Sequence, residues 1–174
     1  MTHCIIKQFD YHIWANKRIF ERLKELPKDV YNQEVQSVFP SIAKALIHIY
    51  VVDCVWLNVL SGKSMTEAIQ IGEHLQEQVE TKTMNELENM FHNVTQQYKV
   101  FLDKQKDINE VVILDNPYAG KLETSVSELV QHVINHGIYH RGNITAMLRQ
   151  LGYPSTMTDF VLYLHEKQKD SSCT

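Results

Sequence analysis

Residues 131–143, Gln131-His-Val-Ile-Asn-His-Gly-Ile-Tyr-His-Arg-Gly-Asn143, place a histidine at every fourth position: His132, His136 and His140. A step of four residues advances about 40° around an α-helix, so the three imidazoles share one narrow stripe. The apolar residues that fall on the same side of this helix are Leu129, Val133, Ile144, Met147 and Leu151. The pattern therefore predicts a helix whose core-facing side carries titratable nitrogen donors.

Histidines on an apolar helix face need polar partners. A buried neutral imidazole has to donate or accept a hydrogen bond, and a divalent cation satisfies several rings at once. For any one of these rings, a hydrogen-bonded neighbour or partial exposure is the simpler explanation. For His136 and His140 together, the spacing of about one helical turn favours joint ligation of one metal ion.

Three further amphipathic helices precede this one and are expected over residues 2–26, 41–60 and 83–106. Pro27 ends the first, Ser41 is the expected N-cap of the second, and Thr83 opens the third as part of a capping box. A second capping box at Ser125 starts the histidine helix, and Gly152 ends it. Residues 61–82 have weak periodicity and are expected to form a loop with a short helical piece.

Between the third and fourth long helices, residues 108–124 combine a β-prone run with Asn116, Pro117 and Gly120, which indicates a short hairpin. A short last helix is expected over residues 158–167. The predicted fold class is therefore all-α: a four-helix bundle with a short hairpin-like insertion before the fourth long helix. We expect a single domain over residues 1–168 and a frayed tail over residues 169–174.

The upstream helices add polar residues to the inward faces. His48 lies on the apolar face of its helix and is the natural third metal ligand, whereas Asp53 lies about 140° away and is expected to face elsewhere. His12 and Asn16 share the apolar stripe of the first helix. They are explained either by neighbouring hydrogen-bond partners or by a polar pocket shared with the downstream histidines. Trp14 lies off that stripe and is expected to cover a neighbouring helix or a subunit contact.

Composition narrows the function classes. The net charge is −4 with no block of like charges, so no nucleic-acid partner is expected. No secretory signal or membrane span is recognised, and cytoplasmic localisation is expected. Cys4, Cys54 and Cys173 are too far apart for a thiolate zinc motif. Any metal site should therefore use nitrogen and oxygen donors.

Three neutral nitrogen ligands leave a metal ion with an open position, which is typical of a working site and not of a structural one. Such an ion lowers the pKa of bound water or of a thiol. A divalent metal is the expected cofactor, with zinc or nickel favoured. Gly137 and Gly142, which are unfavourable inside a helix, suggest close packing or access at the site.

The sequence resembles the DinB family, the DNA-damage-inducible-type proteins grouped with thiol S-transferase-like metal bundles. The resemblance rests on Tyr11-His-Ile-Trp-Ala-Asn16, on residues 41–60 with His48, Asp53 and Trp56, on residues 132–142, and on Leu148-Arg-Gln-Leu-Gly152. It covers almost the whole chain. It implies a four-helix bundle, often a homodimer, with a divalent metal on His48, His136 and His140 and with His132 outside the primary ligands. Asn143 stands where many relatives have Gln.

These observations leave three functions open. The first is a metal-dependent enzyme that joins a low-molecular-weight thiol, a second expected cofactor, to a small-molecule electrophile. The second is a metal-dependent hydrolase in which metal-bound water attacks, and the third is a stress-related metal-binding protein without turnover. Hydrolysis needs a positioned general base, and no carboxylate lies on the histidine faces, which favours thiol transfer.

The residues expected to line the site pocket are Asn16, Trp56, Tyr139 and Asn143. For Trp56 and Tyr139, packing in the core is the competing explanation. Arg141 is expected at the surface or at an interface, where it would be available to an anionic substrate group.

Overall fold

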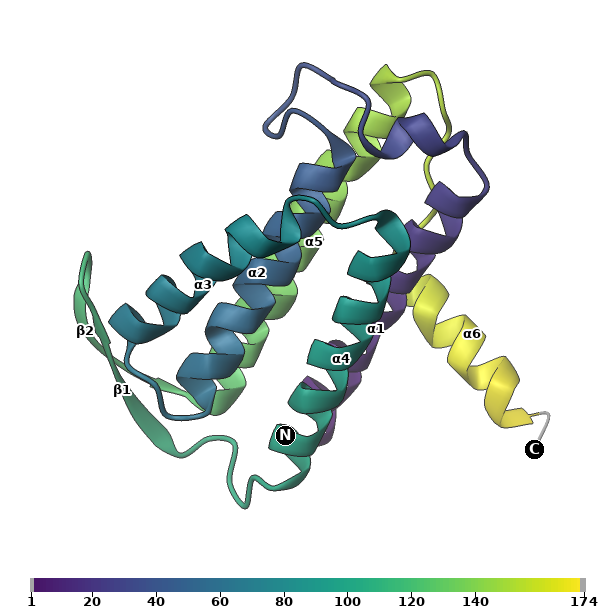
Figure 1. Ribbon diagram of the computed structural model, residues 1–174. Helices are drawn as coiled ribbons and strands as arrows, with labels where there is room; N and C mark the ends of the chain where they lie inside the picture. Colours follow the sequence, from purple (N-terminus) through teal and green to yellow (C-terminus); the bar gives the residue numbers. More distant parts are fainter. Residues whose placement is uncertain (1, 173–174) are drawn as a thin grey trace.

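Four long helices form the body of the computed structural model, which describes residues 2–172 and the side chains of residues 4–170. They are α1 (Thr2–Lys24), α2 (Ile42–Leu60), α4 (Met84–Asp103) and α5 (Val126–Gln150). In Figure 1 they run side by side, and α1 and α2 each contact both α4 and α5. The predicted all-α bundle is confirmed.

The helix ends follow the local sequence. α1 ends shortly before Pro27, and a single turn of 3₁₀ helix, η1 (Lys28–Tyr31), follows. The Ser41 hydroxyl accepts a hydrogen bond from the backbone N–H of Lys44, so it caps α2 as predicted. At the other end of the chain, Gly152 adopts φ +86° directly after α5, a conformation in which glycine has no steric penalty.

The segment between α2 and α4 differs from the prediction. It contains a regular helix, α3 (Met65–Val79), where a loop with a short helical piece was expected. Ser64 and Glu67 form a capping box at its start. Its buried residues include Ala68 and Gly72, which are small, so the apolar periodicity of this segment is weak although the helix packs closely on α2.

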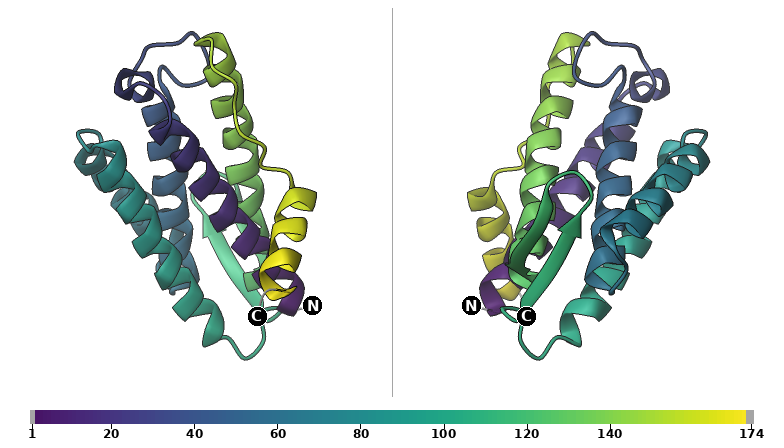
Figure 2. Two further views of the ribbon diagram at one scale, coloured as in Figure 1. Left: turned by 90° about the vertical axis from the view of Figure 1, so that its right-hand side faces the viewer. Right: turned by 90° about the vertical axis from the view of Figure 1, so that its left-hand side faces the viewer.

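The predicted hairpin is confirmed as β1 (Val111–Asn116) and β2 (Gly120–Ser125), an antiparallel pair. The Asn116 side chain accepts hydrogen bonds from the backbone N–H groups of Tyr118 and Ala119, which fixes the turn. Leu114 packs in one cluster with residues of α2, α3 and α5. Because β2 ends at Ser125, the N-cap of α5, the hairpin leads directly into the histidine helix (Figure 2).

The last helix, α6 (Phe160–Ser172), is longer than expected. Residues 169–172, predicted to be frayed, belong to it, and residues 173–174 of that predicted tail lie outside the described residues. α6 lies beside the N-terminal half of α1 (Figure 2). The Trp14 indole donates a hydrogen bond of 2.8 Å to Glu166 of α6, which confirms the expectation that Trp14 covers a neighbouring helix.

α2 supplies the apolar centre of the bundle. By length and composition α2 could cross a membrane, whereas no membrane span was predicted from the sequence. However, 67% of the apolar stretch of α2 is buried inside the bundle, as expected of the core helix of a soluble protein. The fully buried side chains of α2 include those of Ile42, Leu46 and Ile49.

Candidate metal centre

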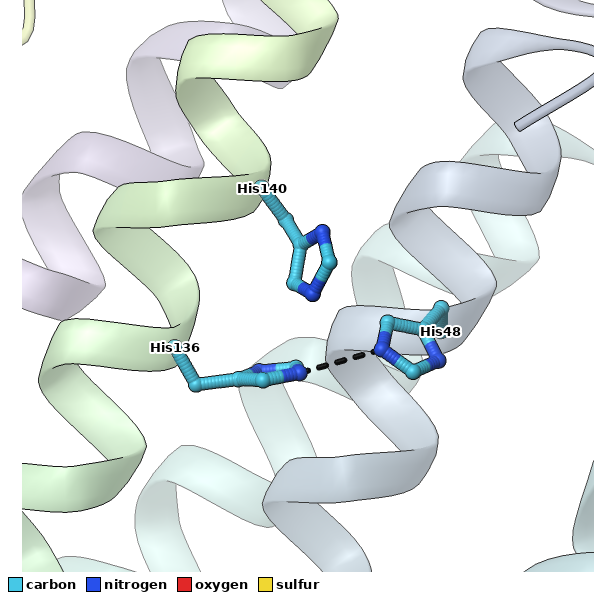
Figure 3. Close-up of side chains that lie close together, drawn as sticks. All are labelled: His48, His136 and His140. Carbon is cyan, nitrogen blue, oxygen red and sulfur yellow. Dashed lines mark hydrogen bonds between the residues drawn. The ribbon is translucent and has the colours of Figure 1, made fainter. Parts of the chain in front are cut away.

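Three imidazoles converge where α2 faces α5 (Figure 3). His136 and His140 project from successive turns of α5, and His48 meets them from α2. The Nε2 atoms of His48 and His136 are 3.0 Å apart, and one nitrogen from each of the three rings lies within 4.8 Å of the others. The sequence-predicted trio is therefore brought together by the fold.

The spacing of these nitrogens suits a metal ion. Ligand nitrogens about 2.0–2.1 Å from a tetrahedral zinc ion lie about 3.3 Å from one another. In this cluster the Nε2 atoms of His48 and His136 lie 3.0 Å apart, and the nitrogens of all three rings lie within 4.8 Å of one another, so small rotations of the rings bring them close to that spacing. The three histidines can hold a divalent metal ion.

The protonation of the rings also suits ligation. Burial lowers the pKa of His48 and of His140 below the ordinary value for histidine. Burial, followed by the neighbouring imidazoles, lowers the pKa of His136 to about 3. All three rings are thus driven toward the neutral form, in which a nitrogen lone pair is free to bind a metal.

Among the described residues, the ligand cluster contains imidazoles and no carboxylate. A divalent ion held by three neutral donors keeps its full charge of about +2, so an anionic ligand is favoured at the open position. His48 and His136 are only half-buried, whereas His140 is buried. The histidines were predicted to lie on core-facing helix sides. The cluster in fact lies near the edge of the bundle and is not sealed in its interior.

Aromatic and amide groups surround the cluster. The Phe39 ring, from the loop before α2, lies 5.1 Å from that of His48 and 5.2 Å from that of His140, measured between ring centroids. Phe39 was not among the predicted site residues, because a loop residue has no helical periodicity to reveal its direction. Asn143 lies 3.3 Å from Nδ1 of His140, and the exposed Tyr139 ring lies 4.9 Å from the His140 ring. Two of the predicted pocket residues, Asn143 and Tyr139, thus touch a cluster histidine.

Trp56 and Asn16, the other two predicted pocket residues, are placed differently. The Trp56 ring packs against that of His132. His132 is itself outside the cluster, and its ring centroid lies 6.3 Å from that of His136. Asn16 is buried in a separate polar network with His12 and Arg141. The pocket that was predicted to join Asn16 to the three histidines is therefore not formed by direct contact.

The prediction that Arg141 lies at the surface or at an interface is wrong. It is only 1% exposed and is the largest fully buried side chain described. Because Arg141 follows His140 by about 100° around α5, it points toward α1, where the Asn16 side chain accepts a hydrogen bond of 2.8 Å from it. His12 and Asn16 are accordingly satisfied by neighbouring side chains, and Asp53 faces away from the cluster, as predicted, to contact His12.

Comparisons with known proteins show the family of this chain. The model of the DinB family matches residues 1–171. Protein DinB of Bacillus subtilis (strain 168) is 49% identical over 164 residues, which span 94% of this chain and 95% of that protein. Because both matches cover nearly the full length, the chain belongs to the DinB family.

Proposed function

We propose that this chain is a divalent-metal-dependent enzyme that transfers a low-molecular-weight thiol to a small-molecule electrophile. The observation that carries the proposal is the donor set, which consists of three imidazoles and, among the described residues, no carboxylate. Three protein ligands would leave a tetrahedral ion one position for an outside ligand. Three neutral donors suit a working site, and they leave the full positive charge of the ion available to a thiolate.

His48, His136 and His140 would hold the metal, which when bound supplies a Lewis acid that lowers the pKa of a thiol. The thiol then loses its proton to solvent, its sulfur forms a bond to the electrophilic carbon, and the leaving group departs with the electron pair of the broken bond. Phe39 and the exposed Tyr139 lie against the cluster histidines, where their rings would contact the apolar part of a substrate. Asn143 would orient His140 through its contact with Nδ1.

Hydrolysis is the second candidate, since the same ion could activate water. A hydrolase usually positions a general base beside the attacking water. The described residues place imidazoles, aromatic rings and an amide next to the cluster, and the carboxylate of Asp53, which faces away from the cluster, is engaged with His12. This favours thiol transfer over hydrolysis and leaves metal binding without turnover as the third candidate.

The test is conjugation of a panel of cellular thiols to a chromogenic electrophile by metal-loaded protein, compared with His48→Ala and with His92→Ala, a histidine exposed on α4. We expect thiol-dependent turnover that is lost in His48→Ala and retained in His92→Ala. Turnover on esters or amides without a thiol would favour the hydrolase. Stoichiometric metal with no turnover, either on the thiols with the electrophile or on esters and amides, would favour a metal-binding protein.

A further inference from the structure

A buried polar network lies behind the metal centre and connects the helices that carry the ligands. Its members are His12 and Asn16 on α1, Asp53 on α2 and Arg141 on α5, none more than 5% exposed. Nε2 of His12 lies 3.1 Å from a carboxylate oxygen of Asp53. Nη1 of Arg141 lies 3.3 Å from Nδ1 of the same ring and 2.8 Å from the Asn16 carbonyl oxygen. One imidazole thus joins α1, α2 and α5.

The chemistry of these groups constrains the tautomer of His12. A guanidinium only donates hydrogen bonds, so Nδ1 of His12 accepts from Arg141 and the ring proton lies on Nε2. Nε2 lies 3.1 Å from the Asp53 carboxylate, which can accept this proton, and also 3.1 Å from the amide nitrogen of Asn16, which is a second donor. A fourth helix joins through Tyr98 of α4, whose hydroxyl donates a 2.8 Å hydrogen bond to the backbone carbonyl of Asp53.

Gly137 makes room for this network. A Cβ atom at this position would lie 2.4 Å from Cε1 of His12 and 2.8 Å from Nη1 of Arg141, both too close for real contacts. Gly137 and Arg141 are one helical turn apart, on the side of α5 next to the one that carries His136 and His140. The backbone of α5 therefore lies close to α1 at a position next to the metal ligands.

Stability alone is a poor explanation for the network. Taking charged groups out of water is costly, and apolar residues of similar volume often stabilise a core at least as well. Three buried atoms also find no hydrogen-bond partner among the described residues: Oδ1 of Asp53 and Nε and Nη2 of Arg141. Directional bonds between fixed atoms, by contrast, set the relative position of helices more sharply than apolar contacts do.

We propose that Asp53, His12 and Arg141 are positioning residues for the metal centre. Asp53 is held in α2, which carries His48, and Arg141 is adjacent in sequence to His140. The chain of contacts from Asp53 through His12 to Arg141 thus fixes α2 and α5 at the separation that lets the three imidazoles converge. This inference rests on the metal binding in the proposed function.

The experiment measures Co²⁺ affinity by competition with a chelator, together with the visible spectrum of bound Co²⁺. The variants are Asp53→Asn, Arg141→Met and the double change Asp53→Leu with Arg141→Met. Leu102→Ala serves as the control, because it truncates a buried side chain on α4, away from the ligands. All measurements are made at a temperature where thermal unfolding shows each protein to be folded.

We expect Asp53→Asn and Arg141→Met to weaken Co²⁺ binding about 10- to 100-fold and to change its spectrum, as loss of a group that orients metal ligands does. The double variant should regain thermal stability relative to either single variant without regaining affinity. Leu102→Ala should lower the melting temperature and leave the affinity nearly unchanged.

Single and double variants that bind Co²⁺ as tightly as the wild type, with the same spectrum, would overturn the positioning role and leave the metal site intact. An affinity that falls in proportion to melting temperature, in Leu102→Ala as in the others, would also overturn it. A wild-type protein that binds no Co²⁺ would instead overturn the metal site itself, so the two failures are distinguishable.

Discussion

Two glycines of α5 show how different the surroundings of one residue type can be along a single helix. Gly137 faces His12 and Arg141 at distances that exclude a Cβ atom, whereas nothing lies within 4 Å of the position a Cβ would take at Gly142. The sequence predicted close packing or access at both positions. The structure supports close packing at Gly137 and open space at Gly142.

Gly137→Ala should therefore destabilise the protein, by about 1–3 kcal/mol or more, because the added methyl group overpacks a site filled by a ring and a guanidinium. Gly142→Ala should stabilise it by up to about 1 kcal/mol, because alanine is the better helix former and meets no neighbour. Urea denaturation of both variants checks this pair. Equal free energies of unfolding for the two variants would contradict it.

Tyr31 provides a test of stability against pH. Burial raises the pKa of Tyr31 from 10.0 to about 12, and its hydroxyl has no hydrogen-bond partner among the described residues. The folded state holds this proton more tightly than the unfolded chain does. Ionisation of Tyr31 therefore leaves stability unchanged below about pH 10 and lowers it as the pH rises from about 10 through 12.

Tyr31→Phe should leave stability at pH 7 unchanged or slightly higher, since it removes an unpaired buried hydroxyl. It should also reduce the loss of stability between pH 10 and pH 12. Tyr118→Phe, at a position 85% exposed, is the matched control and should change neither quantity. Chemical denaturation at neutral and alkaline pH makes the comparison, and identical alkaline losses in Tyr31→Phe and the wild type would refute it.

At the scale of elements, the sequence was informative where apolar side chains are large and regularly spaced. The four bundle helices follow from that spacing, and the N-caps of three of them are Ser41, Thr83 and Ser125, as predicted. α3 was missed because Ala68 and Gly72 are too small to make a strong periodic signal, although the Ser64 capping box was readable. Helical periodicity also could not show that Arg141 is buried, because α5 is buried on the side of Arg141 as well as on its main apolar side.

The start of α3 provides a prediction at this scale. Ser64→Ala removes the hydroxyl that accepts from the Glu67 backbone N–H and should destabilise the protein by about 1 kcal/mol. Thr66→Ala, at an exposed position in the first turn of the same helix, should be neutral or slightly stabilising. The free energy of unfolding in urea measures both effects. A Ser64→Ala protein as stable as Thr66→Ala would show that the cap contributes little to α3.

At the scale of the whole molecule, the bundle joins ligands that are far apart in the chain, since His48 comes from α2 and the other two from α5. These three histidines were predicted as metal ligands from their positions on the core-facing sides of their helices and from the family resemblance. Phe39 and the buried Arg141 network depend on how helices and loops meet in three dimensions, which no local pattern encodes. The homodimer and the cytoplasmic localisation stay predictions, and sedimentation analysis would test the first.

The most direct test of the central claim is the metal content of protein purified without an affinity tag, measured by elemental analysis together with the melting temperature with and without a chelator. We predict about one divalent metal per chain and a melting temperature that falls on chelation, because a metal that binds the folded state stabilises it. His132→Ala, on the same helix but outside the ligand cluster, should retain the metal, and His48→Ala should lose it. Metal retained in His48→Ala, or absent from the wild type, would contradict the account.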